Sequence, residues 1–159
     1  MKKLFTVLFF VLFIQTISSA QLLSTSSSFG ARYVMPVGDI ADFYDGGWGL
    51  TGTGYFSVIP LVDILVEGSW HSLAAKELTT DDILYGPNDL SIMGFTAGAR
   101  VNLLGLVGIG LKGGYFFDDI HEWAIQPFAE ISFLMLSVGA EYRMGEDVDW
   151  AAFYLNVNL

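Results

Sequence analysis

The sequence predicts an all-β fold, an eight-stranded antiparallel up-and-down transmembrane β-barrel, and three observations lead to that prediction. Apolar and polar residues alternate along eight successive segments. Of the 159 residues, 53% are hydrophobic. No apolar run approaches the roughly 20 consecutive residues of a membrane-spanning helix. A high apolar content without a long apolar run excludes helical membrane proteins and favours a barrel that crosses the membrane with strands.

The composition also limits the classes of function. Charged residues make up 15% of the chain and the formal net charge is -10, which disfavours a nucleic-acid partner. The chain has no cysteine, so disulfides, thiolate metal sites and a cysteine nucleophile are excluded. A chain of this length has room for one domain. The composition therefore describes a single, acidic, strongly apolar domain.

The N-terminus has the pattern of a secretory signal peptide, residues 1–20. A basic start is followed by an apolar stretch at residues 4–14 and by a small-residue cleavage site that ends at Ala20. We expect export through the inner membrane and cleavage after Ala20. Residues 21–27 are polar and rich in serine, which predicts a short polar lead-in, and residues 28–159 are expected to form the barrel.

Each of the eight segments places an apolar side chain at every second position, as a strand with two different faces requires. The first sets Phe29, Ala31 and Tyr33 against Gly30 and Arg32. In order, the segments are 29–35, 48–58, 62–71, 93–102, 107–115, 123–133, 136–143 and 151–159. We expect each strand to have the roughly nine to eleven residues with which a tilted strand crosses a bilayer.

The connections between the segments alternate in length. Tight turns are predicted at residues 59–60, 104–105 and 134, and longer acidic loops at 38–46, 72–89, 117–122 and 145–149. This order is expected when both termini of a barrel lie at the short-turn end. We therefore place the short turns on the periplasmic side and the long loops outside the cell.

Aromatic residues support this orientation. Six of them fall on the apolar face near the long-loop end of different segments, namely Tyr33, Trp48, Trp70, Tyr115, Trp123 and Tyr142. Tyrosine and tryptophan gather at the boundary between lipid and water, so these residues predict an aromatic girdle at one interface. The alternative at the level of the fold, a soluble ligand-binding barrel with its apolar face inward, leaves the girdle without a role.

Charged residues separate into two groups. Most of the carboxylates lie in the predicted loops, at Asp39, Asp42, Asp45, Glu77, Asp81, Asp82, Asp89, Asp118, Asp119, Glu122, Glu146, Asp147 and Asp149. The polar faces of the segments carry Arg32, Asp63, Glu67, Arg100, Lys112, Glu130, Glu141 and Arg143. Buried charges are tolerated when they are paired, so the second group predicts an interior network of ion pairs.

Taken together, these features resemble the small eight-stranded outer-membrane β-barrel proteins of Gram-negative bacteria, the OmpX-like and OmpA-transmembrane-domain-like group. The resemblance rests on the signal peptide, the alternating segments, the girdle and the order of turns and loops, over residues 29–159. It implies a protein of the cell envelope located in the outer membrane. The chain departs from the family in ending with Leu159, where such barrels commonly have an aromatic residue that the assembly machinery reads.

We expect a monomeric membrane anchor that acts as a structural or surface-interaction protein through its acidic extracellular loops. Outer-membrane lipid is one expected partner, with lipopolysaccharide phosphates bridged by divalent cations at Asp81, Asp82, Asp118 and Asp119. An extracellular protein that binds loop 72–89 is the other. No residue spacing matches a defined calcium loop, and no metal site, cofactor or nucleic-acid partner is expected.

Two other functions stay open. A narrow ion or small-solute pore is favoured by inward-facing glycines, namely Gly30, Gly94, Gly98, Gly108, Gly110, Gly114 and Gly139. Against it, the large side chains of Tyr55, Phe116 and Tyr154 also point inward. A lipid A-modifying hydrolase is suggested by Glu67, Ser69 and His71 on one strand face. Positions i and i+2 of a strand are about 6.5 to 7 Å apart, which makes direct Ser69–His71 contact awkward, so we expect no enzyme activity.

Overall fold

The computed structural model describes residues 24–59, 61–76, 79–80, 83–84, 88–103 and 105–159. The expected signal peptide and the first three residues of the expected lead-in lie outside this part of the chain. The elements are β1 (Ser24–Val37), the 3-10 helix η2 (Gly38–Asp42), β2 (Tyr44–Ile59), β3 (Val62–Ala75), β4 (Thr79–Thr80), β5 (Ile83–Leu84), β6 (Leu90–Leu103), β7 (Val107–Asp118), β8 (Glu122–Phe133), β9 (Leu136–Arg143) and β10 (Asp149–Asn158).

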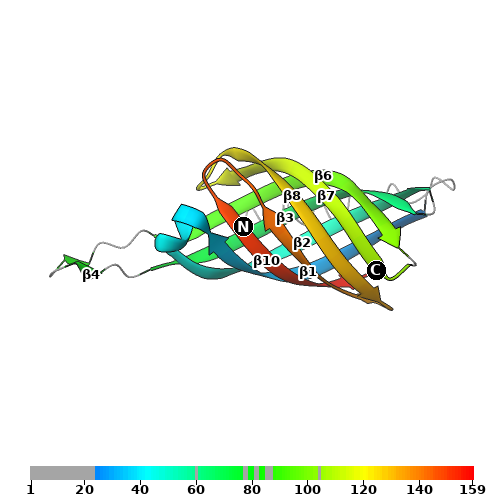
Figure 1. The fold of residues 1–159 in the computed structure, drawn as a ribbon, viewed down its shortest axis with the longest axis horizontal. Coiled ribbons are helices and arrows are strands. Elements are labelled where there is room, and N and C mark those ends of the chain that lie inside the picture. The colour runs from blue at the N-terminus through cyan, green and yellow to red at the C-terminus, as the bar shows by residue number, and fades with distance from the viewer. Residues whose placement is uncertain (1–23, 60, 77–78, 81–82, 85–87, 104) are drawn as a thin grey trace, which may run out of the picture.

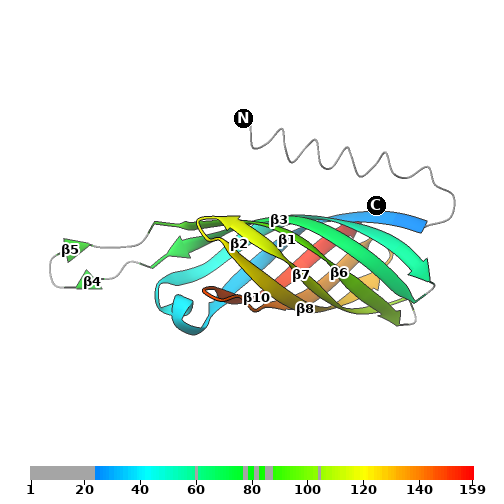
Figure 2. The same cartoon turned by 90° about the horizontal axis from the view of Figure 1, so that it is seen from above.

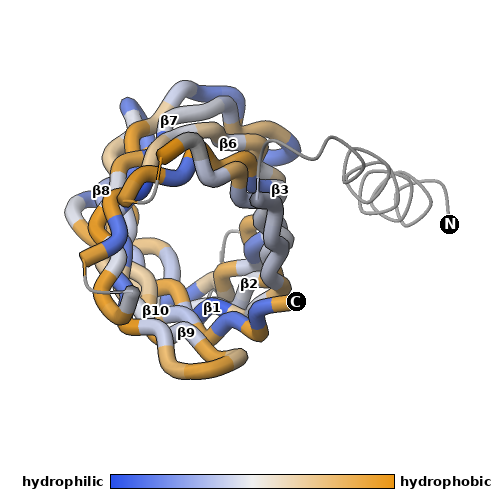
Figure 3. Tube along the Cα trace, turned by 90° about the vertical axis from the view of Figure 1, so that its right-hand side faces the viewer, coloured by the Kyte–Doolittle hydropathy of each residue, from blue (hydrophilic) through white to orange (hydrophobic). Residues whose placement is uncertain are grey.

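Eight of these strands close into one barrel, in the spatial order β1–β10–β9–β8–β7–β6–β3–β2. Every neighbouring pair is antiparallel, and the ring closes where β1 pairs with β10, from Ser28 opposite Asn158 to Val37 opposite Asp149. Figure 3 shows this ring along the barrel axis. The predicted fold class, an eight-stranded antiparallel barrel, is confirmed. No helix among the described residues is long and apolar enough to cross a membrane.

The two ends of the barrel differ as the short and long connections predict. The 3-10 helix η2 and the small hairpin of β4 and β5 lie at one end, and the hairpin extends well beyond the barrel wall (Figures 1 and 2). The start of β1 and the C-terminus lie together at the other end, where Ser27 and Leu159 exchange two backbone hydrogen bonds. We call these the loop end and the turn end.

The strands have two faces with opposite environments. In β7, the exposed residues Ile109 and Leu111 alternate with the buried residues Gly108 and Lys112. The same alternation runs through the other barrel strands, with mostly apolar side chains outward and polar, small or buried apolar ones inward. Because the strand repeat is two residues, the sequence pattern assigns each side chain to the lipid-facing or the interior face.

Several predicted boundaries were wrong. The barrel strands have 8 to 16 residues, a wider spread than expected, with β9 the shortest and β2 the longest. Residues 24–27, expected in the lead-in, belong to β1 and pair with residues 54–57 of β2. The serine and threonine residues at positions 24–27 carry no hydropathic alternation, so the sequence pattern did not reveal this part of the strand, which is paired with β2.

The long loops are shorter and more structured than expected. β3 runs to Ala75 and β7 runs to Asp118, so each takes residues from a predicted loop. In the loop before β6, Thr79 pairs with Leu84 and Thr80 with Ile83, which makes the protruding hairpin. Loop 38–46 contains η2, which nothing in the hydropathy pattern indicated. The region 117–122 reduces to three residues between β7 and β8.

Adjacent glycines in β7 offer a direct test of the two-faced wall. A methyl group on Gly114, which faces the interior, would lie 2.1 Å from the carbonyl oxygen of Phe95, whereas one on Gly113, which faces lipid, meets nothing closer than 3.9 Å. Overpacking of this kind costs about 1 to 3 kcal/mol. We expect Gly114→Ala to lower the free energy of unfolding in a urea titration by that amount, and Gly113→Ala to leave it nearly unchanged. Equal effects of the two substitutions would contradict the assignment of faces.

Candidate functional site

The centre of the barrel holds four charged residues in a closed ring of ion pairs, which we call the tetrad. Arg32 donates to Glu67 and to Glu141, both at 2.5 Å. Lys112 bonds to the same two carboxylates, at 2.9 Å to Glu67 and 2.8 Å to Glu141. Each side chain is at most 3% exposed. Two cations and two anions cancel, so the tetrad is a neutral cluster in which every buried charge has two opposite partners.

A second cluster lies between the tetrad and the turn end. The guanidinium of Arg100 pairs with Asp63 at 2.6 Å and with Glu130, and its carbon lies 4.1 Å from the centre of the Tyr55 ring. The hydroxyl of Tyr154 donates to the other oxygen of Glu130 at 3.1 Å, and this ring also lies 5.4 Å from Arg32. The two clusters therefore meet at Tyr154, and polar contacts continue through the middle of the barrel.

A third cluster corrects the prediction for Glu122. This residue was expected in a solvated loop, but it begins β8, is buried, and accepts a hydrogen bond from Arg143 at 2.7 Å. Its second oxygen accepts the backbone N–H groups of Glu146 and Asp147 at 2.6 and 2.8 Å. Glu122 lies four positions before Gln126, which faces inward, so its position in the strand repeat could have revealed this placement. It thereby fixes the β9–β10 loop to the barrel.

The loop end of the interior is closed by apolar side chains, a feature that the sequence analysis missed. This apolar plug comprises Val34, Leu73, Leu90, Ile92, Phe116, Ala124, Val148, Trp150 and Ala152, all buried. The Phe116 and Trp150 rings meet edge to face at 5.9 Å. The Arg143 guanidinium lies 4.3 Å from the first ring and 4.4 Å from the second. The plug separates the tetrad from the loop end of the barrel.

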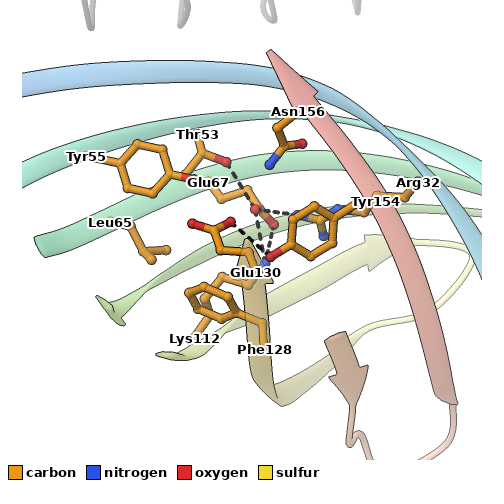
Figure 4. Close-up of a pocket in the computed structure, with 10 residues that line it drawn as sticks. All are labelled: Arg32, Thr53, Tyr55, Leu65, Glu67, Lys112, Phe128, Glu130, Tyr154 and Asn156. Carbon is orange, nitrogen blue, oxygen red and sulfur yellow. Dashed lines mark hydrogen bonds and ion pairs between the residues drawn. The ribbon is translucent and has the colours of Figure 1, made fainter. Parts of the chain in front are cut away.

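Large side chains fill the space above the inward-facing glycines. A methyl group on Gly94 would lie 2.4 Å from the ring of Phe116, and one on Gly139 or Gly110 would lie 2.4 Å from the ring of Tyr154 or Phe128. The cavity beside the tetrad, lined by the residues in Figure 4, offers about 10 Å³ to the centres of water molecules, which is room for about one. At these positions the glycines make room for aromatic rings.

The six girdle residues lie on the outer face. Tyr33, Trp48, Trp70, Tyr115 and Trp123 are exposed, and Tyr142 is half-buried. Two pairs are opposite each other in the strand register and in ring contact, Tyr33 with Trp48 at 5.2 Å and Tyr115 with Trp123 at 5.6 Å. Each pair makes a cross-strand contact between aromatic rings. Tyrosine and tryptophan are also amphipathic, which suits a membrane interface.

The acidic loop residues have two kinds of surroundings. Asp39, Asp42 and Asp45 are exposed around η2. Asp118 and Asp119 instead bond to Ser91 of β6, through its hydroxyl at 2.9 Å and its backbone N–H at 2.7 Å, and so tie β7 to β6. Asp81 and Asp82, the other predicted cation ligands, lie outside the described residues.

Lys76, the single basic residue of the predicted loops, is held by neighbouring loop groups. It donates to the carbonyl of Ala41 at 2.5 Å and lies 3.8 Å from Asp45. Its backbone N–H bonds to the carbonyl of Phe43. No group of three or more histidine or acidic side chains suited to a metal ion occurs within the described part of the chain.

The geometry does not assemble a hydrolase from Glu67, Ser69 and His71. Glu67 is occupied by Arg32 and Lys112 in the tetrad. His71 is fully buried, packs on Trp150 at 5.0 Å, and among the described residues neither of its ring nitrogens has a hydrogen-bond partner. A serine nucleophile requires a base within hydrogen-bond reach, and the His71 ring does not bond to Ser69.

Comparisons with known proteins identify the fold. No protein-family model and no curated protein matches the chain. Among solved structures, the chain is similar to neisserial surface protein A (NspA), with a TM-score of 0.58 and 12% identity over 86% of this chain and 97% of that one. It is also similar to the Yersinia pestis outer membrane protein Ail in a phospholipid bilayer nanodisc, with a TM-score of 0.56 and 12% identity over 86% of this chain and 100% of that one.

A de novo designed transmembrane β-barrel matches as well, with a TM-score of 0.52 and 12% identity over 84% of this chain and 95% of that one. These similarities cover nearly the whole of each neighbour, so the small eight-stranded membrane barrel is the fold of this chain. The resemblance predicted from the sequence is confirmed at the level of fold. At 12% identity the alignment transfers no site residue and no activity.

Disruption of the tetrad tests its contribution to stability. Lys112→Met removes one cation and leaves Glu67 and Glu141 sharing Arg32 alone. Loss of one partner from a buried pair costs about 3 to 5 kcal/mol, and we expect a loss of that size in the free energy of unfolding of the barrel in urea. Glu146→Gln, at an exposed loop carboxylate, is the control and should change it by less than about 0.5 kcal/mol. Similar values for both variants would argue against the tetrad as a stabilising element.

Proposed function

We propose that this chain is an outer-membrane barrel whose role is to anchor a surface outside the membrane, where it acts as a structural or surface-interaction protein. The observation that carries the proposal is the filled interior. The tetrad, the cluster around Arg100 and the apolar plug occupy the interior, and the cavity beside the tetrad has room for about one water molecule. A barrel of eight strands without a continuous lumen offers its loop end as the place for function.

The outer face supports a location in the outer membrane. Apolar side chains cover the lipid-facing side of the strands, and the girdle residues mark one interface. Closed antiparallel barrels with short turns at one end and longer loops at the other are typical of that membrane. Export with a signal peptide in residues 1–20 supplies the route.

Two of the structural neighbours support a role at the surface. Ail is named an attachment invasion locus protein, and NspA is named a surface protein. Here, the hairpin of β4 and β5 extends beyond the barrel and gives an extracellular protein an accessible place to bind (Figure 2). We infer that function in this chain resides in the loops, while the barrel fixes their position.

Lipopolysaccharide is the second partner that the loop end suits. Asp39, Asp42, Glu146 and Asp147 are exposed carboxylates on the loops next to the membrane. Carboxylate oxygens are the ligands that Ca²⁺ and Mg²⁺ prefer, and one such ion bridges a carboxylate and a phosphate. Divalent cations therefore convert a repulsive acidic loop surface into one that binds phosphorylated lipid.

The alternative function, a narrow pore, is tested by conductance in planar bilayers. We expect the refolded barrel to show no discrete channels, because the apolar plug and the tetrad fill its interior. The double substitution Phe116→Ala and Trp150→Ala removes the two largest rings of the plug and serves as a positive comparison. Reproducible channels in the unmodified protein, with a conductance that changes when Arg100 is neutralised, would contradict the anchor function and support a selective pore.

The lipopolysaccharide contact predicts a stability that depends on divalent cations. In vesicles that contain lipopolysaccharide, Mg²⁺ should raise the urea midpoint of the barrel, and in pure phosphatidylcholine vesicles it should not. The variant Asp39→Asn, Asp42→Asn, Glu146→Gln and Asp147→Asn should lose most of this increase. An undiminished increase in the variant would show that the loop carboxylates do not take part.

A further inference from the structure

The turn end of the barrel carries an unusual set of side chains, which we call the turn surface. It consists of Ile59, Leu61, Leu103, Leu106, Leu134 and Met135, from the β2–β3, β6–β7 and β8–β9 connections, and each is between 45% and 85% exposed. Glycine, proline, asparagine, aspartate and serine are the usual residues of tight turns. Among the described residues of these three turns, none is charged. An exposed apolar surface of this kind marks an interaction site.

Along β3, β6, β7 and β8, the turn surface continues the lipid-facing wall without a polar border, and exposed polar residues at this end lie at the start of β1, at residues 24–26. Ile64, Val101, Ile109 and Ile131, the outward residues just inside the turns, are all exposed and apolar. The charged residues nearest this end, Asp63, Arg100 and Glu130, point inward and pair with one another. Protein–protein interfaces normally have a polar rim around an apolar centre, and this surface instead merges with the lipid-facing wall.

Strand length places the turn surface at the far edge of the membrane. From the girdle to the turns there are nine residue steps between Trp70 and Leu61, nine between Tyr115 and Leu106, and ten between Trp123 and Phe133. At a rise of about 3.4 Å per residue and a tilt of about 40°, this distance is roughly 23 to 26 Å along the barrel axis. The apolar band of such barrels is about 25 Å tall. If the girdle marks one interface, the turns lie at the other.

The backbone of the turns also suits an apolar environment. Leu61, Leu106 and Met135 each have a carbonyl that accepts a hydrogen bond from the next strand around the barrel, from Asn102, Ser132 and Asn158 at 2.7 to 2.8 Å. The carbonyl of Leu103 accepts the N–H of Leu106 across its own turn at 3.1 Å. Unpaired backbone groups prevent turns from entering hydrocarbon, and here these carbonyls are paired.

We propose that the turn surface is a lipid-binding surface, immersed in the phospholipid leaflet at the turn end and in contact with acyl chains just below the headgroups. The inference rests on the proposed function, in which the barrel spans the membrane, and it adds the depth at which the turns lie in the leaflet. The barrel thus ends inside the membrane at its turn end, while the loop end extends beyond the opposite interface. A soluble protein with an apolar face is the other conceivable occupant, and the experiment distinguishes the two.

The absence of cysteine from the sequence makes a single-cysteine experiment direct. Met135→Cys and Leu106→Cys place an environment-sensitive fluorophore on two different turns, at positions without positive φ angles. Two further variants are reference positions for the label. Glu146→Cys, at the loop end, is the reference for exposure to water, and Val138→Cys, on the lipid-facing side of β9, is the reference for the membrane interior. Each labelled, refolded protein is measured in phosphatidylcholine vesicles with aqueous iodide as one quencher, and with acyl-brominated phosphatidylcholine as the other.

We expect the labels at residues 135 and 106 to be quenched by brominated lipid. We also expect iodide to quench them less than it quenches the label at residue 146. If both turn labels respond to iodide as residue 146 does, while residue 138 responds to brominated lipid, the turns lie in water. The inference is then wrong, and the turn surface is open to a soluble protein. If residue 138 also fails to respond to brominated lipid, the barrel does not span the bilayer and the proposed function fails with it.

Discussion

The structure depends on one constraint, that no backbone N–H or C=O can remain unpaired in hydrocarbon. An open sheet leaves two edges unpaired, and the pairing of β1 with β10 removes both. Closure then determines the environment of the outer face and of the interior. The outer face meets lipid and must be apolar, and the interior of eight strands is so narrow that side chains fill it. The alternation of residues in the sequence is the direct consequence of these two environments.

Inside the barrel, the corresponding constraint is that each buried charge needs a partner of opposite sign. Four basic residues and five carboxylates are removed from water, and each has a partner of opposite sign. The clusters follow one another along the axis, and the one nearest the loops, Glu122 with Arg143, also holds the backbone of the β9–β10 loop. The ion-paired interior therefore stiffens the wall and positions the loops, which is what the proposed surface anchor requires.

The fold and the facing of side chains could be predicted because a repeat of two residues is visible in one sequence. Glu122 was misplaced because acidity, not its position in the repeat, was used to set the loop boundary. The contacts of Arg32 with Glu67 and Glu141 could not be predicted, because partners across a barrel depend on strand tilt and register. The apolar plug was missed because Leu73 lies in a predicted loop and Val34 is an isolated apolar residue on a face predicted to be polar.

The four members of the tetrad come from β1, β3, β7 and β9, which are alternate strands around the ring. None of its ion pairs joins neighbouring strands, so no single hairpin contains one during folding. The pair of Arg32 with Glu141 spans the seam between β1 and β10, so a sheet that has not yet closed leaves each of these two charges one partner short. The tetrad therefore gives its full stabilisation only when the barrel closes, and it disfavours a barrel that is incomplete.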